Sequence, residues 1–118
     1  MLVVYGIKSC DTCRSALRFL KERGMDHKFH DVRADGLNIQ MLERWADEVE
    51  WEKLVNKSSL TWRKIPETDK NSLNRNKAFA LILDNPTLMK RPIFETEGFF
   101  ALGFSEKRFA DFLDQKIG

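Results

Sequence analysis

The fold is indicated first by the run LVVYGIKSCDTC at residues 2–13. Its apolar, β-branched segment at residues 2–5 predicts a buried strand that Gly6 ends. From Cys10 onward apolar side chains recur at helical spacing, as Cys13, Ala16, Leu17 and Leu20. This pattern predicts a helix that ends at Gly24, where glycine supplies a left-handed cap. The two cysteines therefore lie where a strand turns into a helix.

Three further β segments follow later in the chain. The segment His27–Val32 is short, lacks a helical period and is bounded by glycines, which predicts a second strand. A strand, a helix and a strand within about 30 residues form a βαβ unit, whose strands are parallel with a right-handed crossover. Residues 93–96 and 99–103 flank Glu97-Gly98 and predict a β-hairpin. Ser105 is expected to cap a last helix with an inward face of Phe109, Phe112 and Leu113.

Helices are expected between these β segments. Residues Ile39–Val49 are amphipathic, and Asn38 is expected to cap their start. The predicted inward stripe of this helix is Ile39, Leu42, Ala46 and Val49. The polar segment 56–76 predicts short turns, and Lys77–Leu83 predicts a helix that ends before Pro86.

The order of these elements predicts an α/β fold. The order βαβ…ββα around a four-stranded mixed sheet is the thioredoxin-like arrangement, here with an additional helical subdomain inserted before the hairpin. We expect a single domain over residues 1–118. Its core is expected at about residues 1–36 and 89–118, with the insertion at about 37–88.

Length and composition exclude several classes of protein. The 118 residues, 42% of them hydrophobic, supply one domain with its own core. The net charge of only +2 argues against a dedicated nucleic-acid binder. The longest nearly apolar stretches, Ala78–Leu83 and Phe99–Phe104, are much shorter than the roughly 18–20 residues of a membrane span. Since residues 1–6 carry no signal-peptide pattern, we expect a cytoplasmic protein without membrane or direct nucleic-acid partners.

Cys10 and Cys13 are the candidate catalytic residues. A thiol attacks as its thiolate, and an ordinary cysteine with a pKa near 8.5 is mostly protonated in the cytosol. At a helix start, unpaired N–H groups and the helix dipole are expected to lower the pKa of Cys10. Lys8 and Arg14 add positive charge nearby, whereas Asp11 opposes it. Cys13 is expected to act as the resolving thiol that closes a disulfide with Cys10; alternatively it is only a small apolar residue of the inward stripe.

A zinc site is another possible use of this pair. Cys10, Cys13, His27 and His30 superficially resemble a Cys2His2 finger. Only two residues separate the histidines, whereas a finger has three to five. Side chains three apart on a strand also point to opposite faces. We therefore expect no metal site and surface histidines instead.

Aromatic residues gather in two regions of the sequence. The C-terminal group consists of Phe94, Phe99, Phe100, Phe104, Phe109 and Phe112. We expect this group to fill the core beneath the hairpin and the last helix, rather than to stack on nucleic-acid bases. The run Glu43–Trp51 is expected to form a helix with a partly solvated face. A partner surface marked by Trp45, Trp51 and Trp62 is the alternative.

Several motifs, taken in order, resemble the arsenate reductase (ArsC) family in the branch that includes Spx and YffB. They are YGIKSCDTCR at 5–14, FHDVRADGL at 29–37, TWRK at 61–64, KRPI at 90–93 and LGFSE at 102–106. The resemblance covers nearly the whole chain and implies a thioredoxin-like fold with Cys10 as the nucleophile. It also implies that Pro92 is the family's cis-proline and that Arg91 helps to hold an oxyanion. The alternatives are an ordinary proline at a strand start and a solvated charge.

Two departures from the arsenate reductases affect the expected function. Those enzymes carry two further oxyanion-binding arginines, and at these places this chain reads Asn56-Lys57 and Gly103-Phe104. Arsenate reduction is therefore the third candidate. Cys13 stands where that branch commonly has serine, and so resembles the paired cysteines of Spx, which form a redox switch.

The first expected function is that of an enzyme, a thiol–disulfide oxidoreductase with Cys10 as nucleophile and Cys13 as resolving thiol. The resemblance to YffB implies glutathione as co-substrate, with no tightly bound cofactor. The basic side chains expected to bind the carboxylates of glutathione are Lys8, Lys57, Lys90 and Arg91. Arg14 is a further candidate for binding an anion. The alternative function is a Spx-like redox-sensing regulator that binds RNA polymerase, because a fold alone does not determine function. An inert domain with a vestigial motif is the remaining possibility.

Overall fold

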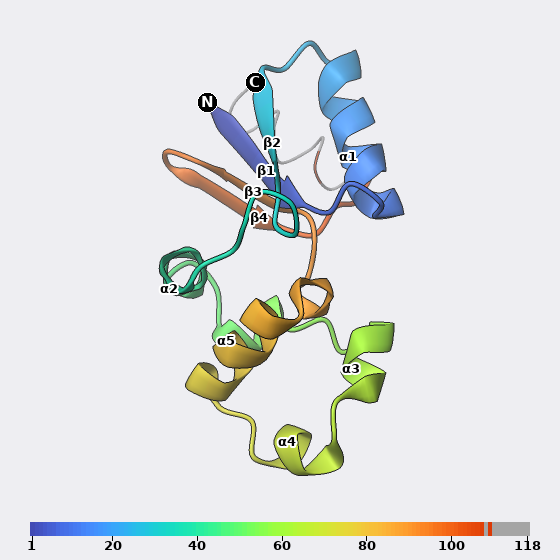
Figure 1. Cartoon of the computed structure of the whole chain (residues 1–118). Helices are drawn as coiled ribbons and strands as arrows, with labels where there is room; N and C mark the ends of the chain where they lie inside the picture. Colours follow the sequence, from blue (N-terminus) through green and yellow to red (C-terminus); the bar gives the residue numbers. More distant parts are fainter. Residues whose placement is uncertain (108, 110–118) are drawn as a thin grey trace. The chain divides into compact units, whose positions relative to one another are not determined.

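The computed structural model describes residues 1–107 and residue 109. It divides the chain into two compact units. Unit 1 comprises Met1–Asp35 and Arg91–Gly118, and unit 2 comprises Gly36–Lys90. The β-sheet lies in unit 1, whereas unit 2 is built mainly from short helices (Figure 1).

Unit 1 is built on a four-stranded mixed sheet in the order β2-β1-β3-β4 (Figure 1). Strand β1 (Leu2–Gly6) pairs in parallel with β2 (His27–Asp31), and helix α1 (Asp11–Glu22) connects them. On its other side β1 pairs antiparallel with β3 (Ile93–Thr96), which forms the hairpin with β4 (Phe99–Leu102). The predicted mixed sheet with its parallel βαβ unit and its hairpin is confirmed.

The core of unit 1 contains α1 and alternate side chains of the sheet. Its buried residues are Leu2, Val4, Ala16, Phe19, Leu20, Phe94, Phe99 and Phe109. The rings of Phe94 and Phe109 lie 4.1 Å apart between centroids, and Phe19 meets Phe109 edge-on at 5.9 Å. Burial of one such side chain contributes roughly 1.5–3 kcal/mol. The predicted aromatic core is therefore confirmed for Phe94, Phe99 and Phe109, and the half-buried Phe104 packs against it. The prediction was wrong for Phe100, which is half-buried and outside this cluster, because it alternates with Phe99 along β4. Phe112 and Leu113 lie outside the described residues.

The last helix begins where the sequence predicts it. Residues 106, 107 and 109 are helical. The N–H group of Phe109 donates to the carbonyl of Ser105 at 2.8 Å, which is the first hydrogen bond of a helical turn. This turn brings the buried Phe109 side chain into the core of unit 1.

Helix α1 ends in a Schellman motif. Gly24 has a φ of +65°, a conformation that glycine adopts without steric strain. Its N–H group donates to Lys21 at 3.0 Å, and the N–H group of Met25 donates to Leu20 at 3.0 Å. The predicted left-handed cap at Gly24 is confirmed.

Unit 2 consists of short helices around its own core. In chain order they are α2 (Ile39–Ala46), η1 (Trp51–Leu54), α3 (Leu60–Lys64), α4 (Glu67–Asn71), α5 (Arg75–Asp84) and η2 (Pro86–Leu88). An antiparallel bridge between Val55 and Met89 ties η1 to the end of the unit. Asparagine side chains cap two of the helices: Asn38 accepts from the N–H group of Met41 at 3.0 Å, and Asn74 caps α5 in the same way.

The sequence prediction for α2 was wrong in its length and in part of its inward stripe. The helix ends at Ala46, because the N–H group of Glu48 donates to Trp45 at 3.0 Å and tightens the next turn. Its buried residues are Met41, Leu42 and Trp45, whereas Ile39, Ala46 and Val49 are half-buried. Trp45 is fully buried, so it fills the core of unit 2 and does not mark a partner surface.

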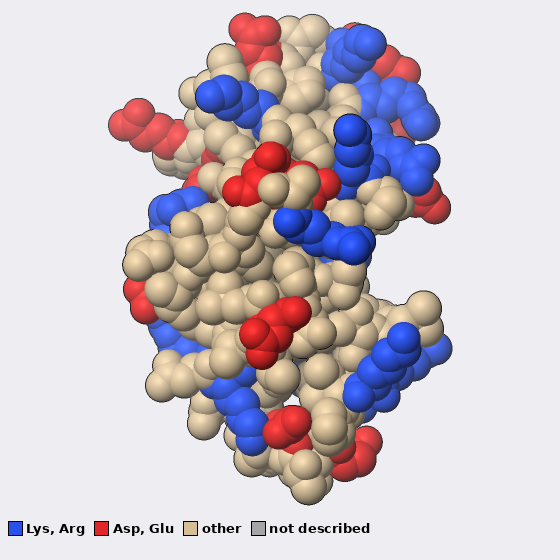
Figure 2. Space-filling model, in the orientation of Figure 1, with Lys and Arg blue, Asp and Glu red and all other residues tan. Residues whose placement is uncertain are grey.

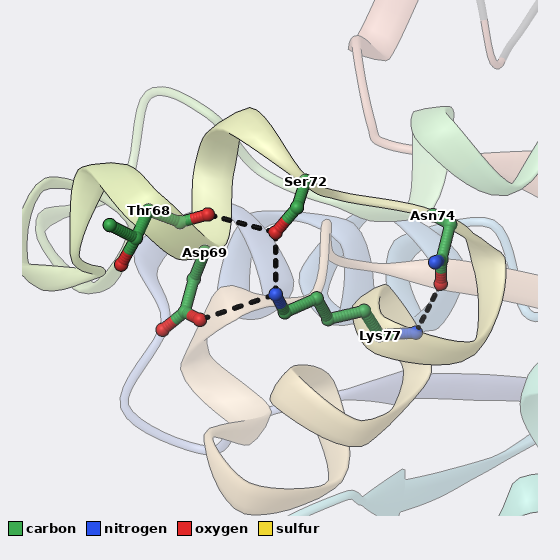
Figure 3. Close-up of polar contacts among 5 residues, drawn as sticks. All are labelled: Thr68, Asp69, Ser72, Asn74 and Lys77. Atoms are coloured by element: carbon green, nitrogen blue, oxygen red, sulfur yellow. Dashed lines mark hydrogen bonds and ion pairs between the residues drawn. The ribbon is translucent and has the colours of Figure 1, made fainter.

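Helix α5 begins two residues before the predicted start at Lys77. The reason is the cap: Asn74 accepts from the N–H group of Lys77 at 2.9 Å, so the first turn lies between them. Figure 3 shows how the same lysine links this turn to α4. Its ammonium donates to the hydroxyl of Ser72 at 2.6 Å and lies 3.4 Å from a carboxylate oxygen of Asp69. The Ser72 hydroxyl in turn donates to the carbonyl of Thr68 at 2.8 Å.

The helices that the structure describes are all short compared with a membrane span. The 12 residues of α1 measure about 18 Å, whereas the hydrocarbon core of a bilayer is about 30 Å thick. None of the helices among residues 1–107 and 109 has the length and apolar character that crossing a bilayer requires.

Candidate active site

Cys10 occupies the N-cap position of α1. The loop that follows β1 brings it there, with its own N–H group donating to the carbonyl of Ile7 at 2.9 Å. Its carbonyl accepts the first helical hydrogen bond, from Arg14 at 3.0 Å. The backbone of Cys10 is extended (φ −80°, ψ 122°), so helical geometry starts at the next residue. Its thiol is free and half-buried.

The surroundings of Cys10 favour its thiolate. Burial raises the pKa of this thiol, because a charge is less well solvated away from water. The backbone N–H group and the thiol of Cys13 act in the opposite direction, as does the guanidinium of Arg91. Together they outweigh burial, so the pKa of Cys10 lies below its ordinary value. The predicted cause, N–H groups at the helix start, is thus joined by an arginine from a distant part of the chain.

Cys13 lies in the opposite environment, one helical turn further on. Its side chain is completely buried on the inward face of α1, and its thiol is also free. Burial, with a smaller contribution from the neighbouring Cys10, raises the pKa of Cys13 to about 12. The backbone of Ile7 and the charge of Arg91 oppose this rise without cancelling it. Cys13 is therefore both a packed residue of the helix stripe and a direct neighbour of the Cys10 thiol.

Gly6 makes room for the Cys13 thiol, a role that the sequence reading did not foresee. A Cβ atom at Gly6 would lie 2.5 Å from Sγ of Cys13 and 3.4 Å from the ring of Phe29. Such a contact is far inside van der Waals distance. The signal in the sequence was a glycine at the end of a strand, which marks either a turn or a close approach.

Arg91 and Pro92 stand at the start of β3. The peptide bond between them is cis, as the family resemblance implies, and Pro92 is buried. The carbonyl of Pro92 accepts a hydrogen bond from Gly103 at 2.8 Å, just beyond β4. Arg91 is half-buried, and its charge favours the thiolate forms of both cysteines. The structure thus brings together Cys10, Cys13 and Arg91.

The other predicted anion-binding residues have different surroundings. Arg14 is exposed; it donates to the carbonyl of Ser9 at 3.2 Å and lies 3.5 Å from the carboxylate of Asp11. Lys8 is also exposed, two residues before Cys10. Lys57 belongs to unit 2, where its ammonium lies 5.7 Å from the centre of the Trp62 ring. The anion-binding roles of these three residues stay predictions.

Basic side chains are frequent on the exposed face of α1. Figure 2 shows Lys and Arg side chains gathered over α1, with fewer acidic side chains among them. The exposed members of this group on α1 are Arg14, Arg18 and Lys21. At the start of the helix Asp11 lies beside Arg14, so the positive charge is spread along the exposed face of α1.

The two histidines do not join the cysteines in a metal site. His27 lies at the start of β2, where its Nδ1 is 2.8 Å from the carbonyl of Met25. The ring of His30 lies 5.1 Å from that of Tyr5. Within the part of the chain that the structure describes, no three His, Cys, Asp or Glu side chains converge as metal ligands would.

Asp31 is the other residue near the site that sequence reasoning missed. It ends β2 and is buried, and its carboxylate accepts a hydrogen bond from the backbone of Lys8 at 2.9 Å. The available signal was an acidic residue at the end of the segment predicted to be the second strand.

Comparisons with known proteins agree with this architecture. The family model described as ArsC family matches residues 5–112. An uncharacterized protein of Haemophilus influenzae is 45% identical over 109 residues, which cover 92% of this chain and 96% of that protein. The global transcriptional regulator Spx of Lactiplantibacillus plantarum is 28% identical over 119 residues, which cover 99% of this chain and 89% of that protein.

A solved structure has the same architecture over almost the same length. A YffB protein shares 37% sequence identity with a TM-score of 0.87, and the match covers 94% of this chain and 97% of that one. The family match includes both cysteines and the Arg91–Pro92 pair. The protein therefore belongs to the ArsC family and has its thioredoxin-like fold.

Proposed function

We propose that the protein is a thiol–disulfide oxidoreductase in which Cys10 attacks and Cys13 resolves. The observation that carries this proposal is a thiol of lowered pKa beside a second, buried thiol in the first turn of α1. A thiolate is the nucleophile in disulfide exchange, and a nearby second thiol allows the enzyme to release its product.

In the first proposed step the Cys10 thiolate attacks a disulfide R–S–S–R′. A bond forms between Cys10 Sγ and one sulfur of the substrate, and the substrate S–S bond breaks. The electron pair of that bond leaves with R′–S⁻, which takes a proton from solvent. Arg91 favours the thiolate before attack and stands near the sulfur at which the exchange occurs.

In the second proposed step Cys13 loses its proton to solvent or to the departing thiolate and attacks Sγ of Cys10. The products are a Cys10–Cys13 disulfide and R–S⁻, so two electrons have passed from the enzyme to the substrate. Part of the high pKa of Cys13 is caused by Cys10. Once Cys10 is bonded to the substrate, its sulfur carries no charge. The contribution of that charge to the raised pKa of Cys13 then disappears. The buried thiol thus becomes easier to ionise after the first step.

Glutathione is the proposed thiol partner. It is an anionic peptide, and its carboxylates suit the positive charge of Arg91 and the basic side chains over α1 (Figure 2). Lys8 is exposed two residues before Cys10 and is proposed to contribute, together with Arg14. The dithiol itself carries the two electrons, so no tightly bound cofactor is proposed. We place the reaction in the cytoplasm, where glutathione keeps such a pair reduced.

The test of the proposal is the reduction of a glutathione mixed disulfide by purified protein. Cys10→Ser is expected to reduce turnover to the uncatalysed rate, because a hydroxyl does not replace the thiolate as a nucleophile. Cys13→Ser is the matched variant: it is expected to accumulate a covalent adduct of one glutathionyl group on Cys10, visible by mass spectrometry. If Cys10→Ser reduces the mixed disulfide as fast as the wild type, the proposal fails.

A redox-sensing transcriptional regulator is the second candidate. The observation that favours it is the match to Spx along 99% of this chain, together with the paired cysteines. The test is a pull-down with RNA polymerase, using reduced protein, oxidised protein and a Cys10→Ser variant that cannot form the disulfide. Binding that differs between the two redox states supports a regulator, and no binding in either state removes this candidate.

Arsenate reduction is ranked third. The places of two oxyanion-binding arginines of the arsenate reductases are held by Asn56-Lys57 and Gly103-Phe104. One guanidinium, that of Arg91, then has to hold the oxyanion with fewer charge-assisted hydrogen bonds. A coupled assay without arsenate-dependent turnover removes this candidate.

A further inference from the structure

Asp31 is a buried charged residue that the proposed exchange reaction does not use. Among residues 1–107 and 109, it is the one acidic or basic residue that is buried. A buried carboxylate is unfavourable unless hydrogen bonds compensate for its lost hydration. Its partners therefore show what the charge holds in place.

The two carboxylate oxygens of Asp31 bind two different backbone segments. Oδ1 accepts from the N–H groups of Arg33 at 2.8 Å and Ala34 at 3.0 Å, which belong to the turn after β2. Oδ2 accepts from the N–H group of Lys8 at 2.9 Å, in the loop between β1 and Cys10. All three donors are main-chain groups, so the carboxylate constrains the path of the chain and not only side chains.

The bond to Lys8 continues the pairing of β1 with β2 beyond the ends of the strands. Just before it, the N–H group of Val32 donates to the carbonyl of Gly6 at 2.9 Å. Just after it, the N–H group of Cys10 donates to the carbonyl of Ile7 at 2.9 Å. The loop is thus held at successive residues from the end of β1 to the reactive thiol. Without Asp31, the middle of this loop would lose its link to β2.

We propose that Asp31 is a positioning residue for Cys10: its carboxylate fixes the loop of residues 7–10 so that the thiol stays close to Cys13 and Arg91. This inference rests on the proposed thiol chemistry. Burial raises the pKa of the Asp31 carboxyl, but the N–H groups of Ala34, Lys8 and Arg33 and the charge of Arg33 outweigh burial. The carboxylate is therefore ionised at neutral pH and accepts all three hydrogen bonds.

The direction in which the pKa of Cys10 changes when Asp31 loses its charge distinguishes a positioning role from a direct electrostatic one. A negative charge that acted directly on Cys10 would disfavour its thiolate, so removal of the charge would lower the pKa of Cys10. A positioning carboxylate acts in the opposite direction. Its removal lets the loop move and weakens the contacts of the thiol with Cys13 and Arg91, which raises the pKa of Cys10.

The experiment uses Asp31→Asn with Asp35→Asn as a matched control. In the Asp31→Asn variant an NH₂ group replaces one carboxylate oxygen. Facing Arg33 and Ala34 it would lose two hydrogen bonds and facing Lys8 only one, so the orientation that breaks the bond to Lys8 is favoured. Asp35 accepts from the N–H group of Asp31 at 2.9 Å in the same turn but does not hold Lys8. The measurement is the pH dependence of alkylation of Cys10 by iodoacetamide, on full-length protein whose folding is checked by circular dichroism.

Asp31→Asn is expected to raise the pKa of Cys10, to slow its alkylation several-fold at pH 7 and to reduce kcat/KM for the mixed disulfide by a similar factor. Asp35→Asn is expected to change none of these. An unchanged or lowered pKa of Cys10 in folded Asp31→Asn overturns the positioning role and leaves the proposed function intact. Absence of exchange by the wild type removes the proposed function, whereas the alkylation result still tests the positioning.

A measurement on the wild type covers the case in which Asp31→Asn does not fold. In an acid titration followed by NMR, the amide proton of Lys8 is expected to shift in step with the carboxyl carbon of Asp31, because the two groups share a hydrogen bond. The side-chain carbon of Cys10 is expected to follow the same titration as the loop loosens. A Lys8 amide that ignores the titration of Asp31 overturns the inference.

Discussion

The two ends of the first turn of α1 carry the same functional group in opposite surroundings. At one end Cys10 lies in an extended, half-buried position, held through hydrogen bonds and near the charge of Arg91. At the other end Cys13 is packed in the core against Gly6. The pKa is lowered at the first thiol and raised to about 12 at the second. Within one helical turn the surroundings therefore change from ones that favour a thiolate to ones that disfavour it.

The contrast also shows what a pair of cysteines does and does not indicate. The spacing of two residues between them brings the thiols together, but it does not determine which of them ionises. That choice depends on N–H groups, an arginine and the depth of burial, which come from several elements of unit 1. The order of the two thiols in the proposed reaction follows from these surroundings.

The largest expected effect is a difference in alkylation rate between the two thiols. At pH 7 a thiol with a pKa of about 12 is ionised to about 1 part in 10⁵, whereas one with the ordinary pKa near 8.5 is about 3% ionised. The more basic thiolate reacts about 40-fold faster once formed, which leaves Cys10 an advantage of ~80-fold before burial is counted. Limited alkylation with iodoacetamide measures this ratio. Fragment ions are needed, because both thiols fall in the tryptic peptide of residues 9–14. Equal labelling of Cys10 and Cys13 would show that the two thiols do not differ in reactivity.

The packing at Cys13 is tested by Gly6→Ala. The new methyl group would lie 2.5 Å from Sγ of Cys13, so the thiol or the strand has to move. Overpacking of this kind costs about 1–3 kcal/mol of the free energy of unfolding. Urea denaturation measures the loss. The positive φ of Gly24, which has open space around it, makes Gly24→Ala a control with conformational strain but no effect on Cys13. A Gly6→Ala protein as stable as the wild type would show that Cys13 is not tightly packed.

A smaller effect on Cys10 is expected from two substitutions at Cys13, one that removes the hydrogen-bond donor and one that keeps it. The thiol of Cys13 helps to lower the pKa of Cys10 by hydrogen bonding. Cys13→Ala removes this donor and is expected to slow the alkylation of Cys10 several-fold at pH 7. Cys13→Ser keeps a donor in the same place and is expected to remain closer to the wild type. The backbone N–H group at residue 13 is present in all three proteins, so equal rates would assign the effect to the backbone alone.

Much of the fold could be predicted because local signals agree with the final packing. The apolar run of β1, the helical spacing after Cys10 and the glycine at residue 24 each indicate their element without reference to the rest of the chain. The inward face of α2 was harder to predict, since an amphipathic pattern containing Met41 and Trp45 fits more than one rotation of the helix. The core of unit 2 selects the rotation that buries Trp45, and a core cannot be read from one helix.

The site was predictable at its cysteines and less so in the groups that act on them. Helix position and spacing indicated Cys10 and Cys13, and a family resemblance pointed to Arg91. Asp31 and Gly6 were missed, because their roles arise from contacts across 23 residues in one case and across a strand–helix junction in the other. A buried acid and a strand glycine have too many ordinary explanations in a sequence for either to indicate such a contact.

The smallest expected effect concerns pH, because one end of the turn is held by a charge and the other by packing. The pKa of Asp31 is lower in the folded protein than its ordinary value of about 3.9, so its ionised form stabilises the fold. This contribution is complete above the unfolded pKa and is lost as the pH falls through the folded value. The destabilisation by Asp31→Asn, measured by urea denaturation, should therefore shrink on acidification from pH 7 to below 4. The destabilisation by Gly6→Ala should stay constant, because no proton is bound at that contact. A parallel decline of both would mean that acid loosens this part of unit 1 as a whole, and that the two ends of the turn are not held independently.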